Sequence, residues 1–454
     1  MPASPLDSEL YRDLFGGAAV AALFREEAEI RAMLAVEGAL AQAQGRLGLI
    51  PADSAAIIAK ATQEVRIDPA ALAARTAQNA VPVPALVETF RAAMNRPEHA
   101  QYVHWGATSQ DIMDTALMLR MRDVLALLEG SLAETLDAVA GHAGAHAALP
   151  MAARSYGQDA TPTTFGAVAA GWGWPLLRHR ERLSQLRPRL LNVSLGGAAG
   201  TLSAMQGQGP ALRAEMARLL ELGDPGASWH SARDGIAELS GWMAGLCGAL
   251  AKMAEDLIVL ARSGVGEVRL GVSGGSSTMP HKQNPVQPSV IVALARQVNA
   301  LDTAIKGALP HREQRDGAAW MTEWLSLPQI CVATAGALQV AKGVIAGLAP
   351  CPEAMRRNLD GGSGLIHAEA LSFALARTRP RPQAQADVAR LSEEARASGT
   401  PLLQLAAQHW PDLALDPVQL AQPGEAAQAA QDFVRAHARA RDDAPVEAWL
   451  APSD

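Results

Sequence analysis

The sequence is poor in cysteine, aromatic residues and charge, and each shortage excludes a class of protein. The three cysteines, Cys247, Cys331 and Cys351, stand far apart and form no CxxC pair. This spacing excludes a disulfide scaffold, offers no zinc-ligand pattern, and is typical of a reducing, cytoplasmic compartment. Aromatic residues make up 4% of the chain, whereas alanine and leucine abound, which favours helices over strands.

The sequence also gives little reason to expect a membrane or a nucleic acid as a partner. No uninterrupted apolar run approaches the ~18 residues of a membrane span. Residues 1–9 have neither the basic nor the apolar region of a signal peptide. The net charge of -7 disfavours binding to nucleic acid or to acidic membrane surfaces. A small anionic substrate stays compatible with this charge, because local basic groups can outweigh the mean.

The chain does contain long stretches in which apolar residues recur with the period of a helix. Apolar residues from Ile236 to Leu260 recur at alternating steps of three and four, which predicts roughly 37 Å of helix. Similar stripes predict long helices over 112–139, 286–305 and 324–345. The stripes are compatible with a bundle core inside one chain and with contacts between subunits. No convincing period-two pattern of strands is found, so we predict an all-α protein.

Proline and glycine punctuation divides the chain into three parts. Residues 1–107 are broken repeatedly by proline and predict an N-terminal domain of short helices. Residues 108–349 hold the long stripes and predict a central bundle that also serves oligomerisation. Residues 350–454 return to proline and glycine breaks and predict a small helical C-terminal domain.

The first of three polar segments covers residues 102–111, ahead of a long helix. Thr108 and Asp111 have the spacing of a capping box, which by itself is a structural feature of a helix start. The functional alternative is that hydroxyl and free N–H groups at this helix N-terminus hold a carboxylate. Thr108, Ser109 and Gln110 are the candidates for that contact.

The second polar segment covers residues 154–166. Thr161 followed by proline is typical of an N-cap and the first helical position, so we expect a helix to begin there. Arg154 and Gln158 add hydrogen-bond donors just before it. Upstream, His146 lies in an alanine-rich stretch. A histidine in such a stretch can have a structural role, can be exposed to solvent or can be catalytic, and the sequence leaves all three alternatives open.

The third polar segment covers residues 273–285 and is richer in chemistry than a linker needs. Two glycines permit positive φ, two serines follow, and Met279 and Lys282 precede an asparagine–proline pair that is again typical of a helix start. Three such donor-rich helix ends, brought together, would bind a di- or tricarboxylate and stabilise a carbanion conjugated to a carboxylate. A serine of this loop could then exchange the α-proton, provided that Lys282, N–H groups and exclusion of water stabilise its anion.

Two further polar patches lie at predicted helix ends. His230 and Arg233 precede the stripe that begins at Ile236, and Arg315 lies in the charged run 311–316. Solvated charge is the ordinary interpretation of such patches, and contact with an anionic substrate is the alternative.

The third segment resembles the signature of the fumarase/aspartase superfamily. The pattern GSSxMPxKxNP is complete in Gly275, Ser276, Ser277, Met279, Pro280, Lys282, Asn284 and Pro285. The resemblance extends to the other two segments, in the same order and spacing. Within the superfamily, stretches such as 104–111, 196–201 and 266–268 are most similar to the 3-carboxy-cis,cis-muconate cycloisomerases.

The resemblance implies a three-domain, all-α fold in a homotetramer, with active sites shared between subunits and with no cofactor or metal. It implies that Ser276 handles the proton and that Lys282 and Asn284 bind and polarise a carboxylate. The predicted catalytic residues are Ser276, Lys282 and His146, because sequence alone does not settle which of them donates the proton. The predicted substrate-binding residues are Thr108, Ser109, Gln110, Arg154, Tyr156, Gln158, Thr161, Ser277, Met279, Asn284, His230, Arg233 and Arg315.

The implied activity is lactonisation of 3-carboxy-cis,cis-muconate in aromatic-acid catabolism, in which a substrate carboxylate adds across a conjugated diene. Two residues depart from the pattern. Tyr156 stands where the lyases carry histidine and the cycloisomerases usually carry tryptophan, and Gln283 replaces a common arginine. The alternatives are a fumarate-releasing C–N or C–O lyase, similar to adenylosuccinate lyase but with another substrate, and a catalytically inactive helical oligomer.

Overall fold

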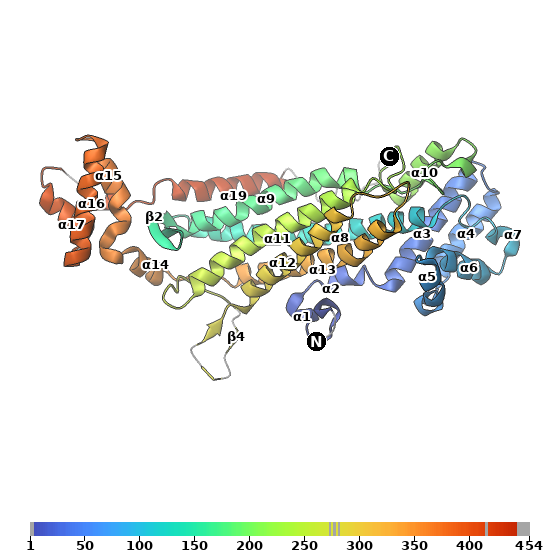
Figure 1. Ribbon diagram of the computed structural model, residues 1–454, viewed down its shortest axis with the longest axis horizontal. Coiled ribbons are helices and arrows are strands. Elements are labelled where there is room, and N and C mark those ends of the chain that lie inside the picture. The colour runs from blue at the N-terminus through green and yellow to red at the C-terminus, as the bar shows by residue number, and fades with distance from the viewer. Residues whose placement is uncertain (1–3, 272–273, 276–277, 280–281, 414–415, 443–454) are drawn as a thin grey trace.

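The computed structural model describes residues 4–271, 274–275, 278–279, 282–413 and 416–442. The chain is elongated, with a bundle of long helices in the middle and a smaller helical unit at each end (Figure 1). The predicted long-helix bundle is therefore confirmed.

The bundle consists of helices that match the apolar stripes of the sequence. They are α8 (Ser109–Ala145), α9 (Phe165–Leu190), α11 (Asp234–Ala261), α12 (Val286–Gly307) and α13 (Gly317–Ala346). All eight residues of the seam from Ile236 to Leu260 are buried, since steps of three and four keep them on one face of α11. Among the described helices, α13 is long and apolar enough by composition to cross a membrane, but 61% of its apolar window is buried inside the bundle, as in a core helix.

The N-terminal unit contains helices that are distant in sequence. Its helices are α3 (Glu26–Arg46), α4 (Ala52–Glu64), α5 (Ala73–Asn79), α6 (Val83–Met94), α7 (Pro97–Ala100) and α10 (Gly209–Leu220). The two helices before them, α1 (Arg12–Phe15) and α2 (Ala18–Ala22), pack instead against the bundle, where Val20 is part of the core. Side chains of residues 193–220 share one hydrophobic core with α3, α4 and α6. This packing unit therefore extends beyond the expected range 1–107.

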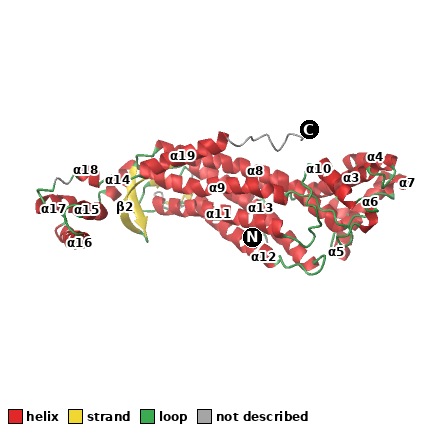
Figure 2. Cartoon of the chain, turned by 90° about the horizontal axis from the view of Figure 1, so that it is seen from above, coloured by secondary structure: helices red, strands yellow, loops and turns green. Residues whose placement is uncertain are grey.

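The C-terminal unit has its own small core. Its helices are α14 (Pro352–Leu359), α15 (Ala368–Leu375), α16 (Arg381–Ser398), α17 (Leu402–His409) and α18 (Pro417–Leu420). The last helix, α19 (Ala426–Asp442), leaves this unit and lies along α9 in both views (Figures 1 and 2). Its Phe433 is fully buried in the core of the bundle, so α19 packs apart from the core of the C-terminal unit.

The described chain is mostly helical, as expected, but short strands that the sequence pattern did not reveal lie between some helices. Strands β1 (Pro150–Ser155) and β2 (Gln158–Thr164) form an antiparallel hairpin, β3 (Val268–Arg269) pairs with β6 (Ala349–Pro350), and β4 (Gly274–Gly275) pairs with β5 (Gln283–Asn284). Tyr156 and Gly157 form the two-residue loop of the first hairpin, with φ of 51° and 74°. Positive φ at both positions matches the right-handed twist of the strands.

The helix start expected at Thr161 was wrong, and the start expected after Asn284 is shifted by one residue, because Pro285 is the N-cap of α12. Thr161 lies in β2, and α9 begins only at Phe165, where the Thr164 hydroxyl accepts a hydrogen bond from the Ala167 N–H at 3.1 Å. Asn284 lies in β5, opposite Gly274. In both cases the residues before the helix satisfy their backbone groups by strand pairing, so the cap falls after them.

Candidate active site

The first polar segment is organised around the carboxylate of Asp111, which is fully buried. It accepts hydrogen bonds from the backbone N–H groups of Thr108 at 3.0 Å, Gly196 at 2.7 Å and Gly197 at 3.0 Å. It also contacts the Nε2 atom of His230 at 2.8 Å. The predicted capping box is therefore confirmed, and the same carboxylate attaches the start of α8 to a glycine loop and a histidine.

Gln110 and Arg315 add an adjacent layer of hydrogen bonds. The amide nitrogen of Gln110 donates to the backbone carbonyl of His230 at 2.9 Å and to Asp114 at 3.1 Å. The amide oxygen of Gln110 accepts from Arg315 Nε at 2.9 Å. Three residues predicted from separate parts of the sequence thus lie together at one end of the bundle.

Arg233 is a buried cross-link between three helices. Its guanidinium donates to Asp114 on α8 at 2.7 and 3.1 Å and to Glu323 on α13 at 2.9 Å, and it lies 4.7 Å from the Trp229 ring centroid. Desolvation opposes its charge, but the two carboxylates outweigh that effect and raise the pKa of Arg233. The guanidinium N–H groups of Arg233, which the sequence predicted to bind the substrate, are therefore used in contacts within the protein.

The acidic partners were the residues that sequence reasoning missed. The predicted site residues included neither Asp114 nor Glu323, because burial against an arginine leaves no local signal in the sequence. The side chain of His311 is also buried here, with Nε2 at 3.7 Å from Glu323. Burial lowers the pKa of His311, and neither ring nitrogen has a hydrogen bond within the described part of the chain.

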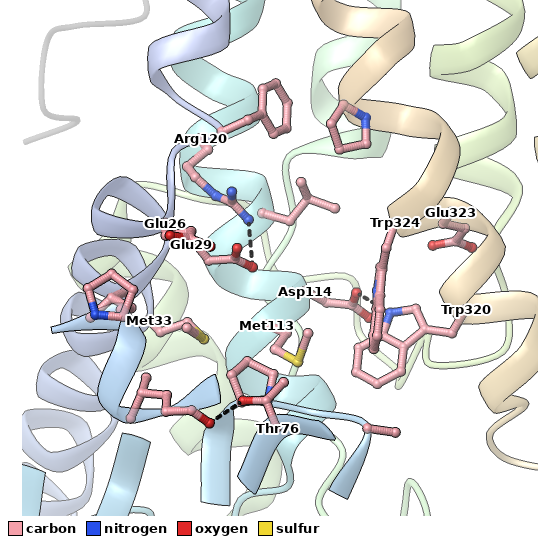
Figure 3. Close-up of a pocket in the computed structure, with 18 of the residues that line it drawn as sticks. Glu26, Glu29, Met33, Thr76, Met113, Asp114, Arg120, Trp320, Glu323 and Trp324 are labelled. Atoms are coloured by element: carbon pink, nitrogen blue, oxygen red, sulfur yellow. Dashed lines mark hydrogen bonds and ion pairs between the residues drawn. The ribbon is translucent and has the colours of Figure 1, made fainter. Parts of the chain in front are cut away.

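A cavity of about 610 Å³ adjoins this cluster, between α3, α5, α8 and α13. Apolar groups including Met33, Met113 and Trp324 line it, and Trp320 Nε1 donates to Asp114 at 3.2 Å on one wall (Figure 3). On the opposite wall Arg120 Nη2 lies 3.5 Å from a Glu29 oxygen. Carboxylates outnumber cations in this lining, so this chain alone does not complete a site for a polycarboxylate.

The remaining predicted residues lie at the other end of the bundle. His146 is the C-cap of α8, whose N-cap is Thr108, and 37 helical residues at 1.5 Å each separate the two by roughly 55 Å. Burial, with a smaller contribution from His142, lowers the pKa of His146. Lys282 and Met279 are exposed and lie between β4 and β5 in sequence. Strand β4 projects from the bundle (Figure 1).

The second segment lies at the same end as His146. Tyr156 and Gln158 are exposed at the hairpin tip, and Thr161 is half-buried in β2. Arg154, by contrast, is held by carboxylates on all three of its guanidinium nitrogens. Ser276 and Ser277 lie outside the described residues. One chain therefore does not bring the three polar segments together.

No group of three His, Cys, Asp or Glu side chains within the described ranges is placed to hold a metal ion. What the two ends of the bundle offer instead are N–H, amide, ammonium and guanidinium groups, which suit an organic anion.

Comparison with known proteins places the chain among enzymes. A lyase family profile matches residues 17–300. The chain is similar to 3-carboxy-cis,cis-muconate cycloisomerase from Pseudomonas aeruginosa, with 41% identity over 82% of each protein. It is 38% identical to nitrosuccinate lyase from Streptomyces davaonensis over 89% of this chain and 88% of that one.

Solved structures agree with these matches. The 3-carboxy-cis,cis-muconate lactonizing enzyme from Pseudomonas putida superimposes with a TM-score of 0.89 and 34% identity, over 96% of this chain and 100% of that chain. The resemblance deduced from the GSSxMPxKxNP pattern is thereby confirmed. The chain belongs to this lyase family, the fumarase/aspartase superfamily.

Proposed function

We propose that this protein is a cycloisomerase that lactonises 3-carboxy-cis,cis-muconate. The observation that carries the proposal is the similarity to cycloisomerases in both sequence and structure, at 41% identity over 82% of the chain and a TM-score of 0.89. In this reaction one carboxylate of the substrate adds to its conjugated diene. A proton is then delivered to the carbon next to another carboxylate, through an enolate-like intermediate.

The two ends of the bundle suit two parts of that chemistry. The helix N-terminus at Thr108 and Ser109, with Arg315 nearby, would bind one carboxylate of the substrate. Lys282 and Asn284 would bind the carboxylate that takes up the developing charge, and Ser276 would handle the proton. His146 is the alternative proton-transfer group, and burial lowers its pKa, which favours the neutral, proton-accepting form.

The separation of roughly 55 Å along α8 leads us to propose a homotetramer in which each site combines segments of different subunits. Complete exposure of Tyr156 supports this arrangement, because a tyrosine at a projecting hairpin tip is suited to contact another copy. The exposed Lys282 at the same end supports it as well.

A substrate panel with the purified enzyme tests the activity. Lactone closure removes the diene absorbance of carboxymuconate, and we expect this loss with the wild-type enzyme. The Ser276→Ala variant should turn over about 100-fold more slowly or worse, as expected on loss of a proton-transfer group. An enzyme that leaves carboxymuconate unchanged would refute the proposal.

A second candidate is a lyase that releases fumarate or a related unsaturated acid. The 38% identity to nitrosuccinate lyase favours it, as do Tyr156 and Gln283, which depart from the cycloisomerase pattern. The same panel, extended to argininosuccinate, adenylosuccinate, aspartate and nitrosuccinate, distinguishes the two, because a fumarate-releasing lyase generates fumarate absorbance and a cycloisomerase does not.

A further inference from the structure

A fully buried glutamate, Glu267, lies where three parts of the molecule meet. It directly precedes β3, within ten residues of the signature serines, and its backbone N–H donates to the Leu260 carbonyl at the end of α11. Its own carbonyl accepts from the Cys351 N–H at 2.8 Å. The backbone of Glu267 is therefore fixed between the bundle and the start of the C-terminal unit.

The Glu267 carboxylate joins two further elements. Its two oxygens accept from Arg154 Nη1 at 2.7 Å and Nη2 at 2.8 Å, so the pair is bidentate. One oxygen also accepts from the Asn358 amide on α14 at 2.8 Å, and that amide donates to the Val265 carbonyl at 3.0 Å. A buried carboxylate is tolerated because these donors compensate its lost hydration.

Arg154 is fully occupied by this arrangement. Its third nitrogen, Nε, lies 3.0 Å from a carboxylate oxygen of Asp159 on the opposite strand of the hairpin, where the two residues pair in register. The hydrogen bonds to Glu267 raise the pKa of Arg154 and keep it charged. The guanidinium therefore holds β1 against β2 and both against β3.

The contacts of Arg154 affect the hairpin tip, which begins two residues after it in sequence. Tyr156 is fully exposed there with positive φ, so nothing in its own chain orients it apart from the strands below. A rigid hairpin base is therefore needed to hold Tyr156 and Gln158, at the tip, in one fixed orientation.

We propose that Glu267 is a positioning residue, which through Arg154 holds the Tyr156 hairpin in register with the signature segment. Arg154 then supports the site instead of binding substrate. This inference rests on the proposed function, in which the hairpin tip and the signature segment contact the substrate.

A double-mutant cycle with carboxymuconate tests the inference. Glu267→Gln and Arg154→Gln should each lower kcat/KM by about 10- to 100-fold, as expected for displaced contact groups. The double variant should be no worse than the more severe single variant, because each residue acts through the other. Multiplying effects would show that Arg154 binds substrate independently and would overturn the proposal, as would full activity in Glu267→Gln.

If Glu267→Gln does not fold, two other variants still test the positioning role. Arg154→Lys keeps a charge next to Glu267 but cannot bridge both Glu267 and Asp159. It should therefore lower kcat/KM at temperatures at which the variant remains folded. Glu129→Gln removes the partner of Arg187 between α8 and α9, away from both ends of the bundle, and should leave kcat/KM unchanged. A normal kcat/KM in Arg154→Lys would refute the positioning role.

Hydrogen exchange without substrate separates this inference from the proposed function. Amides of residues 151–163 should exchange faster in Glu267→Gln than in the wild type or in Glu129→Gln. A wild-type enzyme inactive on carboxymuconate would refute the proposed function while the exchange result still reports on the hairpin. Unchanged exchange in Glu267→Gln would refute the inference whatever the substrate.

Discussion

At the scale of single residues, Arg233 shows how a buried charge is balanced. It is paired with two buried carboxylates, Asp114 and Glu323, so the trio carries one net negative charge. Removing the arginine leaves two like charges facing each other in a low-dielectric interior. Removing one carboxylate leaves a neutral pair.

These two losses should differ in cost. We expect Arg233→Met to lower the free energy of unfolding by about 3–5 kcal/mol or more, the usual cost of stranding a buried charge. Glu323→Gln should cost clearly less, because Asp114 still compensates the arginine. Urea unfolding of both variants measures the difference, and equal destabilisation would contradict the charge balance described here.

His179 predicts a loss of stability in mild acid. Burial, with smaller contributions from Arg182 and Arg178, lowers its pKa from 6.5 to about 4. Its stabilising contribution is complete above pH 6.5 and is lost as the pH falls to about 4, because the unfolded chain takes up this proton first. The shift corresponds to about 3 kcal/mol.

The measurement is the melting temperature of the wild type and of His179→Asn between pH 4 and pH 7. The variant should show a flatter decline. Some decline should persist, because the pKa values of His146 and His311 are also lowered. Identical slopes in the two proteins would exclude His179 as a source of acid sensitivity.

At the scale of elements, a close contact of Phe433 contributes to the packing of α19 on the bundle. The ring of Phe433 occupies the space above Gly173 of α9, where an added Cβ would lie 2.0 Å from the ring. Phe433→Ala should lower the free energy of unfolding by about 3–5 kcal/mol, through lost burial and the cavity it leaves. Val418→Ala, at a 70% exposed residue of α18 in the C-terminal unit, is the control and should change stability by less than about 0.5 kcal/mol.

The elements also show where a local signal misleads. The pairs Thr161-Pro162 and Asn284-Pro285 both predicted a helix start by cap chemistry. The first helix begins three residues after Pro162, at Phe165, and the second one residue after Pro285, at Val286. The decisive signal in the first case was Tyr156-Gly157, a two-residue loop with positive φ at both positions, which pairs the flanking residues as strands. Capping propensity is a weak local preference, and strand pairing across a hairpin overrides it.

At the scale of the whole molecule, the distance between the two ends predicts complementation between inactive variants. Arg315→Ala removes a group at the Thr108 end, and Lys282→Ala removes one at the other end. If each site combines segments of different subunits, co-expression of the two variants should restore activity that neither shows alone. Mixed oligomers then contain some sites with both residues intact.

The check is the activity of the co-expressed mixture against each variant alone, with sedimentation to establish the oligomeric state. No recovery in mixed oligomers, or a fully active monomer at assay concentration, would contradict shared sites.

The sequence by itself determined the long helices and the chemistry of the family. Apolar residues spaced by three and four lie on one face of a helix, and that face is stable only when it is buried. The GSSxMPxKxNP pattern identifies the superfamily from residues that are close in sequence. Tertiary structure decided what local spacing cannot encode. It paired Asp111 with His230 and Arg233 with Glu323, placed residues 193–220 in the N-terminal core, and returned α19 to the bundle. These contacts join residues that are distant in sequence, and their energy comes from burial and charge compensation that exist only once the chain has folded.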